Sequence, residues 1–174
     1  ANSKVMDEAQ SQKLLIPETR QNFAKNQLVV IVAKDSKIAI SKFSDLANDK
    51  VKKVALTNSK ISLGNQTKEV LNNLKIYDKV QKKSISVDDK VREILNLVEN
   101  KQVDAGITYS NEAKRSKQVK MAATAEEKSY TQPVSVAAVL TSSKNVAEAK
   151  AFIEFLKSDK AASVLEKYGL TKIK

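Results

Sequence analysis

The 174-residue sequence contains no cysteine and no histidine, and it has only three glycines and two prolines. Without cysteine there are no disulfides, thiolate nucleophiles or thiolate metal ligands. Histidine is the usual general base near neutral pH, so any catalysis would depend on Asp, Glu, Lys or Tyr side chains. No Walker loop, glycine-rich dinucleotide turn, histidine-based metal motif or nucleophile elbow occurs either. We therefore predict that the protein is not an enzyme and uses no cofactor.

Long hydrophobic runs are also lacking, because the longest apolar stretch, residues 28–33, is far shorter than the roughly 20 residues of a membrane helix. That stretch predicts a buried strand. The composition, with 41% hydrophobic and 29% charged residues, is typical of a folded globular protein. The sequence begins at Ala1 without a Met or an apolar leader, as expected for a processed chain or a fragment.

Positive charge is plentiful, with a formal net charge of +11. Nucleic-acid binding is one interpretation of this excess, because clustered Lys and Arg side chains release counterions from phosphates. Here the basic pairs, such as Lys52-Lys53 and Lys114-Arg115, are separated by acidic residues and form no stripe interleaved with aromatics. We predict a lysine-rich solvated surface and no nucleic-acid partner.

Apolar spacing predicts alternating strands and helices. The expected strands are 28–33, 54–57, 80–86, 103–108, 119–123 and 134–140, and the expected helices are 4–14, 67–74, 91–98, 146–156 and 161–168. This alternation indicates an α/β fold with mostly parallel sheets flanked by helices. Such sheets bind ligands at the carboxyl ends of their strands, which places a site at the loops 58–65, 86–91 and 109–112. Asp88 and Asp89, in a capping-box pattern with Ser86, are interpreted as helix caps and not as a catalytic pair.

Several stretches together carry a resemblance to a known family. They are Thr19–Val30, Ile61–Leu71, Asp89–Glu99, Asp104–Tyr109, Ala151–Leu156 and Leu165–Gly169. In this order and spacing the sequence resembles the periplasmic molybdate/tungstate-binding proteins of bacterial ABC transporters, over nearly the whole chain. The resemblance implies a type II periplasmic-binding-protein fold with two lobes. Residues 1–25 and 131–174 would form part of the first lobe and residues 26–130 the second.

The resemblance also implies where the hinge between the two lobes lies and which segment of the family precedes Ala1. Connections near 26–33 and 130–140 would act as the hinge. Family members begin with a strand and helices whose loops supply two serine ligands, and this stretch is missing before Ala1, so the first lobe is expected to be incomplete.

The resemblance assigns the site to neutral hydrogen-bond donors. Leu63 and Val91 would each donate a backbone N–H near a helix N-terminus, where unpaired N–H groups and the helix dipole favour an anion. Tyr109 would donate its hydroxyl. The family's usual Val-Pro-Ala-Gly loop reads Ile-Ser-Leu-Gly here, so Ser62 is a further candidate donor, whereas Asn65 and Gln66 are interpreted as loop and capping residues. Molybdate or tungstate would be held only as an oxyanion, without side-chain ligands to the metal.

The implied function is capture of a tetrahedral oxyanion for an ABC transporter, with a membrane permease as partner. The protein would be a monomer when complete, located in the periplasm or as a cell-surface lipoprotein. One alternative keeps the fold and changes the ligand to sulfate, phosphate or a small organic anion. Another is an effector-binding regulator domain, against which the lack of a helix-turn-helix segment argues.

Overall fold

The computed structural model describes residues 1–88 and 91–173, which divide into two compact units. Unit 1 comprises residues 1–26 and 133–174, and unit 2 comprises residues 27–132. The chain therefore passes between the units twice, after Asn26 and after Gln132. The sequence placed the corresponding boundaries after residues 25 and 130, and the identification of the units with the two lobes of a binding protein stays a prediction.

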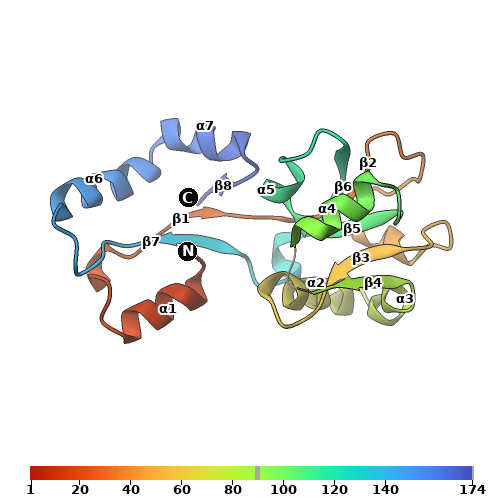
Figure 1. Ribbon diagram of the computed structural model, residues 1–174, viewed down its shortest axis with the longest axis horizontal. Coiled ribbons are helices and arrows are strands. Elements are labelled where there is room, and N and C mark those ends of the chain that lie inside the picture. Colours follow the sequence, from red (N-terminus) through yellow and green to blue (C-terminus); the bar gives the residue numbers. More distant parts are fainter. Residues whose placement is uncertain (89–90, 174) are drawn as a thin grey trace. The chain divides into compact units, whose positions relative to one another are not determined.

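Unit 2 is built on a five-stranded sheet (Figure 1). In order across the sheet, the strands are β4 (Ser84–Val87), β3 (Val54–Thr57), β5 (Ala105–Tyr109), β2 (Leu28–Ala33) and β6 (Val119–Thr124). β3 pairs in parallel with both β4 and β5, and β2 runs antiparallel to both β5 and β6. The sheet is therefore mixed, with the predicted parallel pairing confined to β4, β3 and β5 and antiparallel pairing on both sides of β2.

Helices cover both faces of this sheet. They are α2 (Ser62–Asn73), α3 (Tyr77–Gln81), α4 (Val91–Glu99) and α5 (Ser110–Ala113), with 3-10 turns at η2 (Phe43–Ala47) and η3 (Glu127–Ser129). Gly106 of β5 lies against α4, because a Cβ there would be 2.5 Å from the Cγ2 atom of Ile94. Ala55 is in register with Gly106 and so faces the same side, which directs its neighbour Leu56 to the opposite face, toward α2 and α3.

The segment between α2 and β4 differs from the prediction. A strand was expected from residue 80, but Val80 lies in α3 and β4 begins only at Ser84. Val80 is fully buried, and the backbone N–H of Lys83 donates to its carbonyl at 3.1 Å, which closes a helical turn. A single buried valine in a polar run fits a helix or a strand, and tertiary packing selects the helix here.

The core of unit 2 is one continuous apolar cluster that extends from Leu28 to Tyr130. All six side chains of β2 are buried, as are all four of β3. Both strands are covered on both faces, which is why they appear in the sequence as unbroken apolar runs. This packing fixes the ends of β3, β4 and β5 on which a site can be built.

Unit 1 combines a small sheet with three helices. Its elements are α1 (Ser3–Ser11), η1 (Pro17–Thr19), β1 (Gln21–Lys25), β7 (Val134–Ala137), α6 (Val146–Leu156), α7 (Asp159–Lys167) and β8 (Thr171–Lys172). The sheet, in the order β7-β1-β8, is antiparallel, so the mostly parallel pairing predicted for both sheets is wrong here. β1 was not predicted, because only Ala24 among its five residues is buried and the strand has no apolar run.

Candidate functional site

The three loops singled out from the sequence lie at one edge of the sheet of unit 2. β4, β3 and β5 are neighbouring parallel strands, so their carboxyl ends meet at the same edge. β3 leads into α2, β4 leads toward α4, and α5 follows β5 directly. The carboxyl ends of β3, β4 and β5, at Thr57, Val87 and Tyr109, are thereby brought together, as expected for a ligand site in an α/β sheet.

The N-terminus of α2 supplies backbone N–H groups at this edge. The helix begins at Ser62, five residues before the predicted start, so part of the expected loop 58–65 is helical. The first bond along the helix runs from the N–H of Asn65 to the carbonyl of Ile61, at 3.1 Å. The N–H groups of Ser62, Leu63 and Gly64 precede that bond, and Ile61 provides no side-chain cap. Leu63 therefore presents an N–H without a helical acceptor, while its side chain is buried in the core.

The first turn of α2 rests directly on the loop that follows β3. A Cβ at Gly64 would lie 1.8 Å from the backbone oxygen of Asn58, so only glycine permits this approach. Asn58 also joins two strand ends, because its Nδ2 donates to Oδ1 of Asp88 at 3.2 Å and its Oδ1 accepts from the N–H of Lys60 at 3.0 Å. The position of the helix N-terminus is thus fixed by backbone contacts and a side-chain amide.

Tyr109 is the last residue of β5, and its hydroxyl reaches α2. The hydroxyl donates to Oε1 of Gln66 at 2.7 Å. Gln66 lies one turn after Leu63 and is only 7% exposed. Burial, together with the neighbouring Tyr130, raises the pKa of Tyr109 above the usual value for a phenol. The phenol therefore stays protonated, and remains a hydrogen-bond donor, across the physiological pH range.

Val91 is the first residue of α4 and packs, half-buried, against the same core as Ile61 and Tyr109. The residues before it, Asp89 and Lys90, lie outside the described residues, and so does the part of the expected capping box that involves Asp89. Because β4 leads toward α4, Val91 at the start of α4 lies at the same sheet edge as Leu63 and Tyr109.

Two polar residues of α2 differ in their surroundings. Ser62 is exposed at the first helical position, at the edge where a further donor was expected. Gln66 was interpreted as a loop or capping residue, but it is buried within the helix and bonded to Tyr109. Its role was missed because Gly64 and Asn65 suggested a loop. The helical spacing of Leu63, Gln66 and Val70, which share one buried face of α2, is the signal that could have predicted this role.

The described residues include no group of three or more Asp or Glu side chains placed to hold a metal ion. None of the helices in the described ranges is long and apolar enough to cross a membrane. At the edge formed by β4, β3 and β5, the structure presents backbone N–H groups, hydroxyls and amides, together with the carboxylate of Asp88, which accepts from Asn58.

The chain is similar to several bacterial binding proteins. A Bacillus subtilis (strain 168) protein named "Putative ABC transporter substrate-binding lipoprotein YvgL" is 37% identical over 147 residues, which is 84% of this chain and 55% of that protein. The molybdate-binding protein ModA of Escherichia coli (strain K12) is 32% identical over 179 residues, which covers 98% of this chain and 68% of ModA. The chain thus spans between about half and two thirds of the length of these relatives.

Solved structures of bacterial binding proteins are also similar to this chain. One Clostridium difficile structure, named "substrate binding domain of putative molybdenum ABC transporter", is 33% identical, with a TM-score of 0.87 over 98% of this chain and 74% of that one. The periplasmic molybdate-binding protein of Azotobacter vinelandii shares the fold, with a TM-score of 0.78 over all of this chain and 77% of that one at 19% identity. The type II periplasmic-binding-protein fold predicted from the sequence is confirmed. Residues 1–171 match the family described as bacterial extracellular solute-binding protein, and the chain belongs to that family.

Proposed function

We propose that this protein captures a tetrahedral oxyanion, molybdate or tungstate, for an ABC transporter. The observation that carries the proposal is the uncapped N-terminus of α2, where the N–H of Leu63 is free of a helical acceptor, on the helix whose Gln66 binds the protonated hydroxyl of Tyr109. The names of the relatives, which include molybdate-binding proteins, support the choice of ligand.

Neutral donors alone can hold such an anion. The start of a helix carries roughly half a positive charge, so the N–H of Leu63, with that of Val91 at the start of α4, would solvate a dianion without a lysine or arginine. A site that offers only donors selects a fully deprotonated oxyanion, because a protonated one would place a donor against a donor. Ser62 would add a hydroxyl donor at the same helix start.

Tyr109 would change partners when the anion enters. Its hydroxyl hydrogen points toward Gln66 in the structure, and a phenol has only one hydrogen to donate. Binding therefore requires the hydroxyl to turn from Gln66 to an anion oxygen. Gln66, one helical turn from Leu63, would then hold the phenol oxygen in place through its amide NH₂ group.

The two units suggest how capture would work. The two chain crossings, after Asn26 and Gln132, would act as the hinge of an opening and closing motion. Ligand contacts would favour the closed form, and that form would dock to the membrane permease. We propose accordingly a monomeric, non-catalytic receptor without a cofactor, in the periplasm or as a cell-surface lipoprotein. The family's description as extracellular supports this location.

Titration calorimetry tests the proposal. Residues 1–174 are titrated with molybdate, tungstate, sulfate and phosphate, and we expect heat of binding from the first two at concentrations where the others give none. Tyr109→Phe should weaken molybdate binding roughly 10- to 150-fold, because a hydrogen bond to a charged group contributes about 1.5–3 kcal/mol.

Tyr168→Phe is the matched control, since Tyr168 is a 64% exposed tyrosine of unit 1, whereas Tyr109 belongs to unit 2. Binding of sulfate or phosphate in preference to molybdate would replace the ligand and keep the fold. An unchanged affinity in Tyr109→Phe would remove Tyr109 from the site.

A further inference from the structure

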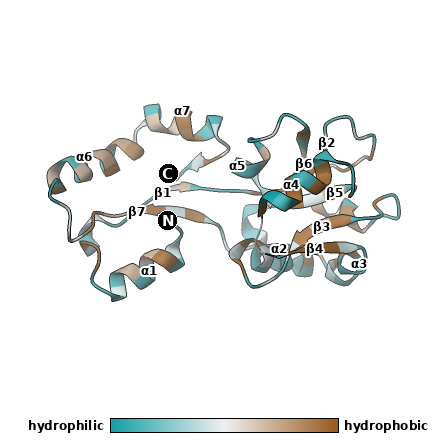
Figure 2. Cartoon of the chain, viewed as in Figure 1, coloured by the Kyte–Doolittle hydropathy of each residue, from teal (hydrophilic) through white to brown (hydrophobic). Residues whose placement is uncertain are grey.

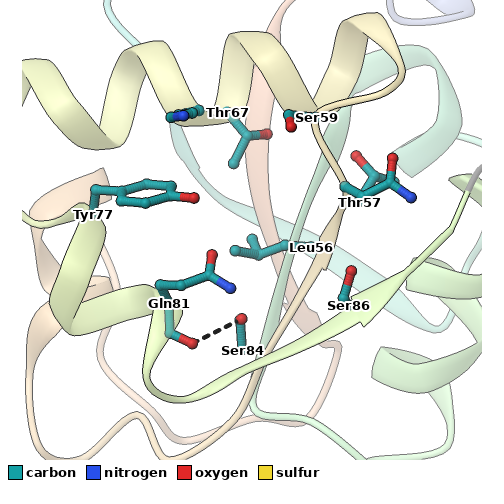
Figure 3. A pocket seen from close by; sticks show the side chains of 11 residues that line it. Leu56, Thr57, Ser59, Thr67, Tyr77, Gln81, Ser84 and Ser86 are labelled. Carbon is teal, nitrogen blue, oxygen red and sulfur yellow. Dashed lines mark hydrogen bonds between the residues drawn. The ribbon is translucent and has the colours of Figure 1, made fainter.

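Unit 2 contains a polar cavity of about 220 Å³ that lies between α2, α3, β3 and β4 (Figure 3). Figure 3 shows the hydroxyl of Tyr77, the side-chain amide of Gln81 and the hydroxyl of Ser86 pointing into this space, with Thr67 beside them. Leu56 forms an apolar part of the wall. One ordered water needs only about 10–15 Å³ by a comparable measure, so the cavity has room for a small ligand.

One buried hydroxyl in the wall of this cavity has no hydrogen-bond partner. Thr67 is 3% exposed, and its Oγ1 atom is unpaired within the described structure. Buried polar atoms in folded proteins are nearly always paired, because an unsatisfied one is destabilising. Such a hydroxyl on a cavity indicates that a polar molecule completes its hydrogen bonds.

The charge around the cavity favours an anion. Lys68 lies on the wall, and its ammonium is 5.7 Å from the centre of the Tyr77 ring. None of the described residues that line the cavity carries a carboxylate, and none of the ion pairs among described residues involves Lys68. Gly64, in the first turn of α2, also lines it and brings the positive end of the helix close.

The cavity is separate from the proposed site at Tyr109. Gly64, Thr67 and Lys68 face the cavity, whereas Leu63 and Gln66 face the core and Tyr109. At 3.6 residues per turn, the centres of these two sets lie about 120° apart around the axis of α2. One helix therefore separates two polar surfaces.

We propose that this cavity is a second ligand site of unit 2, which binds a small anion of the phosphate or carboxylate type. Thr67 donates its hydroxyl to the anion from the buried wall. Tyr77 and Gln81 donate from α3, and Lys68 neutralises charge at the exposed side.

The test compares two threonine variants that differ only in whether the hydroxyl lines the cavity. Thr67→Val removes the buried hydroxyl from the wall with little change of shape. Thr108→Val is the matched control, because Thr108 is also fully buried with an unpaired Oγ1 but does not line the cavity. Both variants should raise the melting temperature of the ligand-free protein, since each removes an unsatisfied buried hydroxyl.

Binding is followed by amide chemical-shift changes during titration with inorganic phosphate, acetate and glycerol. We expect phosphate or acetate to shift the amides of Thr57, Gly64 and Thr67. Thr67→Val should weaken this binding by about 10-fold or more, and Thr108→Val should leave it unchanged. Lys68→Gln should weaken it by a smaller factor that shrinks at high salt.

The other outcomes overturn the proposal. A response to glycerol alone would exclude an anion, and a silent titration with all three probes would leave a water-filled cavity. If phosphate binding is lost in Tyr109→Phe and kept in Thr67→Val, phosphate occupies the oxyanion site proposed above and not this cavity. If the wild type does not bind molybdate but phosphate still shifts the amide of Thr67, the proposed function fails and the second site stands.

Discussion

The two units differ in how they bury apolar surface. Apolar residues occur in the helices and strands of both units (Figure 2). In unit 2 one apolar cluster extends from Leu28 to Tyr130. In unit 1 the cluster found among the described residues consists of Met6, Leu15 and Val136. Unit 1 also leaves large apolar side chains exposed, including Phe152 at 60% and Tyr168 at 64%.

This contrast indicates which unit can hold a precise site. An apolar cavity of about 430 Å³ lies in unit 1, between α1, α6 and the sheet, and Ile153 lines it. Side chains beside such a space lose dispersion contacts, so the unit is less tightly held. Hydrogen bonds such as that between Tyr109 and Gln66 require a fixed backbone, and the structure provides it in unit 2.

The largest expected effect comes from a matched pair of isoleucines. Ile107 is fully buried in β5 of unit 2, and Ile153 is 5% exposed in unit 1. Ile107→Ala should lower the free energy of unfolding by about 2–5 kcal/mol, because it opens a cavity in a close-packed core. Ile153→Ala should lower it less, since this side chain already borders empty space. Urea unfolding measures both, and an equal loss from the two variants would show that unit 1 is as well packed as unit 2.

A second prediction tests the tight packing of unit 2 in the opposite direction. The Cβ added in Gly106→Ala would lie 2.5 Å from Ile94 Cγ2 and 3.1 Å from Val98 Cγ2. Overpacking of this kind should lower the unfolding free energy by about 1–3 kcal/mol. The double variant Gly106→Ala/Ile94→Leu removes the Cγ2 methyl group that the added Cβ would meet and should recover part of the loss. Gly106→Ala without any loss would mean that α4 moves freely on the sheet.

Sequence patterns predicted the buried parts of unit 2 well, because covered strands leave apolar runs. β2 and β3 were placed at the residues where the structure has them. The start of α2 was missed, since Gly64 and Asn65 are poor helix formers and the helix is held by Asn58, which is close in space through the loop. Propensity is local, whereas this contact depends on the fold.

The candidate site was predictable only in part, for the same reason. The resemblance named Leu63, Val91 and Tyr109, and the structure brings them to one sheet edge. The bond from Tyr109 to Gln66 and the unpaired hydroxyl of Thr67 depend on how α2 packs, which no spacing rule reports. Likewise, β1 pairs with β7, more than 100 residues away, and has no apolar run to indicate it.

A smaller effect is expected from the exposed aromatic pair of α6. Phe152 and Phe155 stack with their ring centroids 6.3 Å apart, and both rings are exposed. Phe152→Ser should change the unfolding free energy by no more than about 0.5 kcal/mol, because little area is buried. It should also reduce self-association in sedimentation velocity, since exposed apolar patches promote it. Phe43→Ser, at a fully packed position in unit 2, is the destabilising control. If Phe152→Ser lowers the unfolding free energy as much as Phe43→Ser does, the Phe152 ring is covered in solution.

The smallest expected effect concerns the pKa of one carboxylate in each unit. In unit 2, Asp45 accepts from the N–H groups of Ser41 and Lys42, at 2.9 and 3.1 Å, and from the Ser41 hydroxyl, and these bonds lower the pKa of Asp45. In unit 1, the pKa of Asp159 is lowered by a hydrogen bond and by the charge of Lys172, 2.8 Å away.

Both carboxylates stabilise the fold above the unfolded pKa of about 3.9, and this contribution is lost as the pH falls through the lower folded value. Salt separates the two causes, because it screens the exposed Asp159–Lys172 pair but not the bonds from backbone N–H groups to Asp45. In an NMR titration we expect 1 M NaCl to return the pKa of Asp159 toward its ordinary value and to leave that of Asp45 low. Lys172→Gln should reproduce the effect of salt on Asp159 alone. If salt instead raises the pKa of Asp45 as much as that of Asp159, the turn before η2 is not held by its backbone bonds, and the rigidity ascribed to unit 2 does not extend to its surface turns.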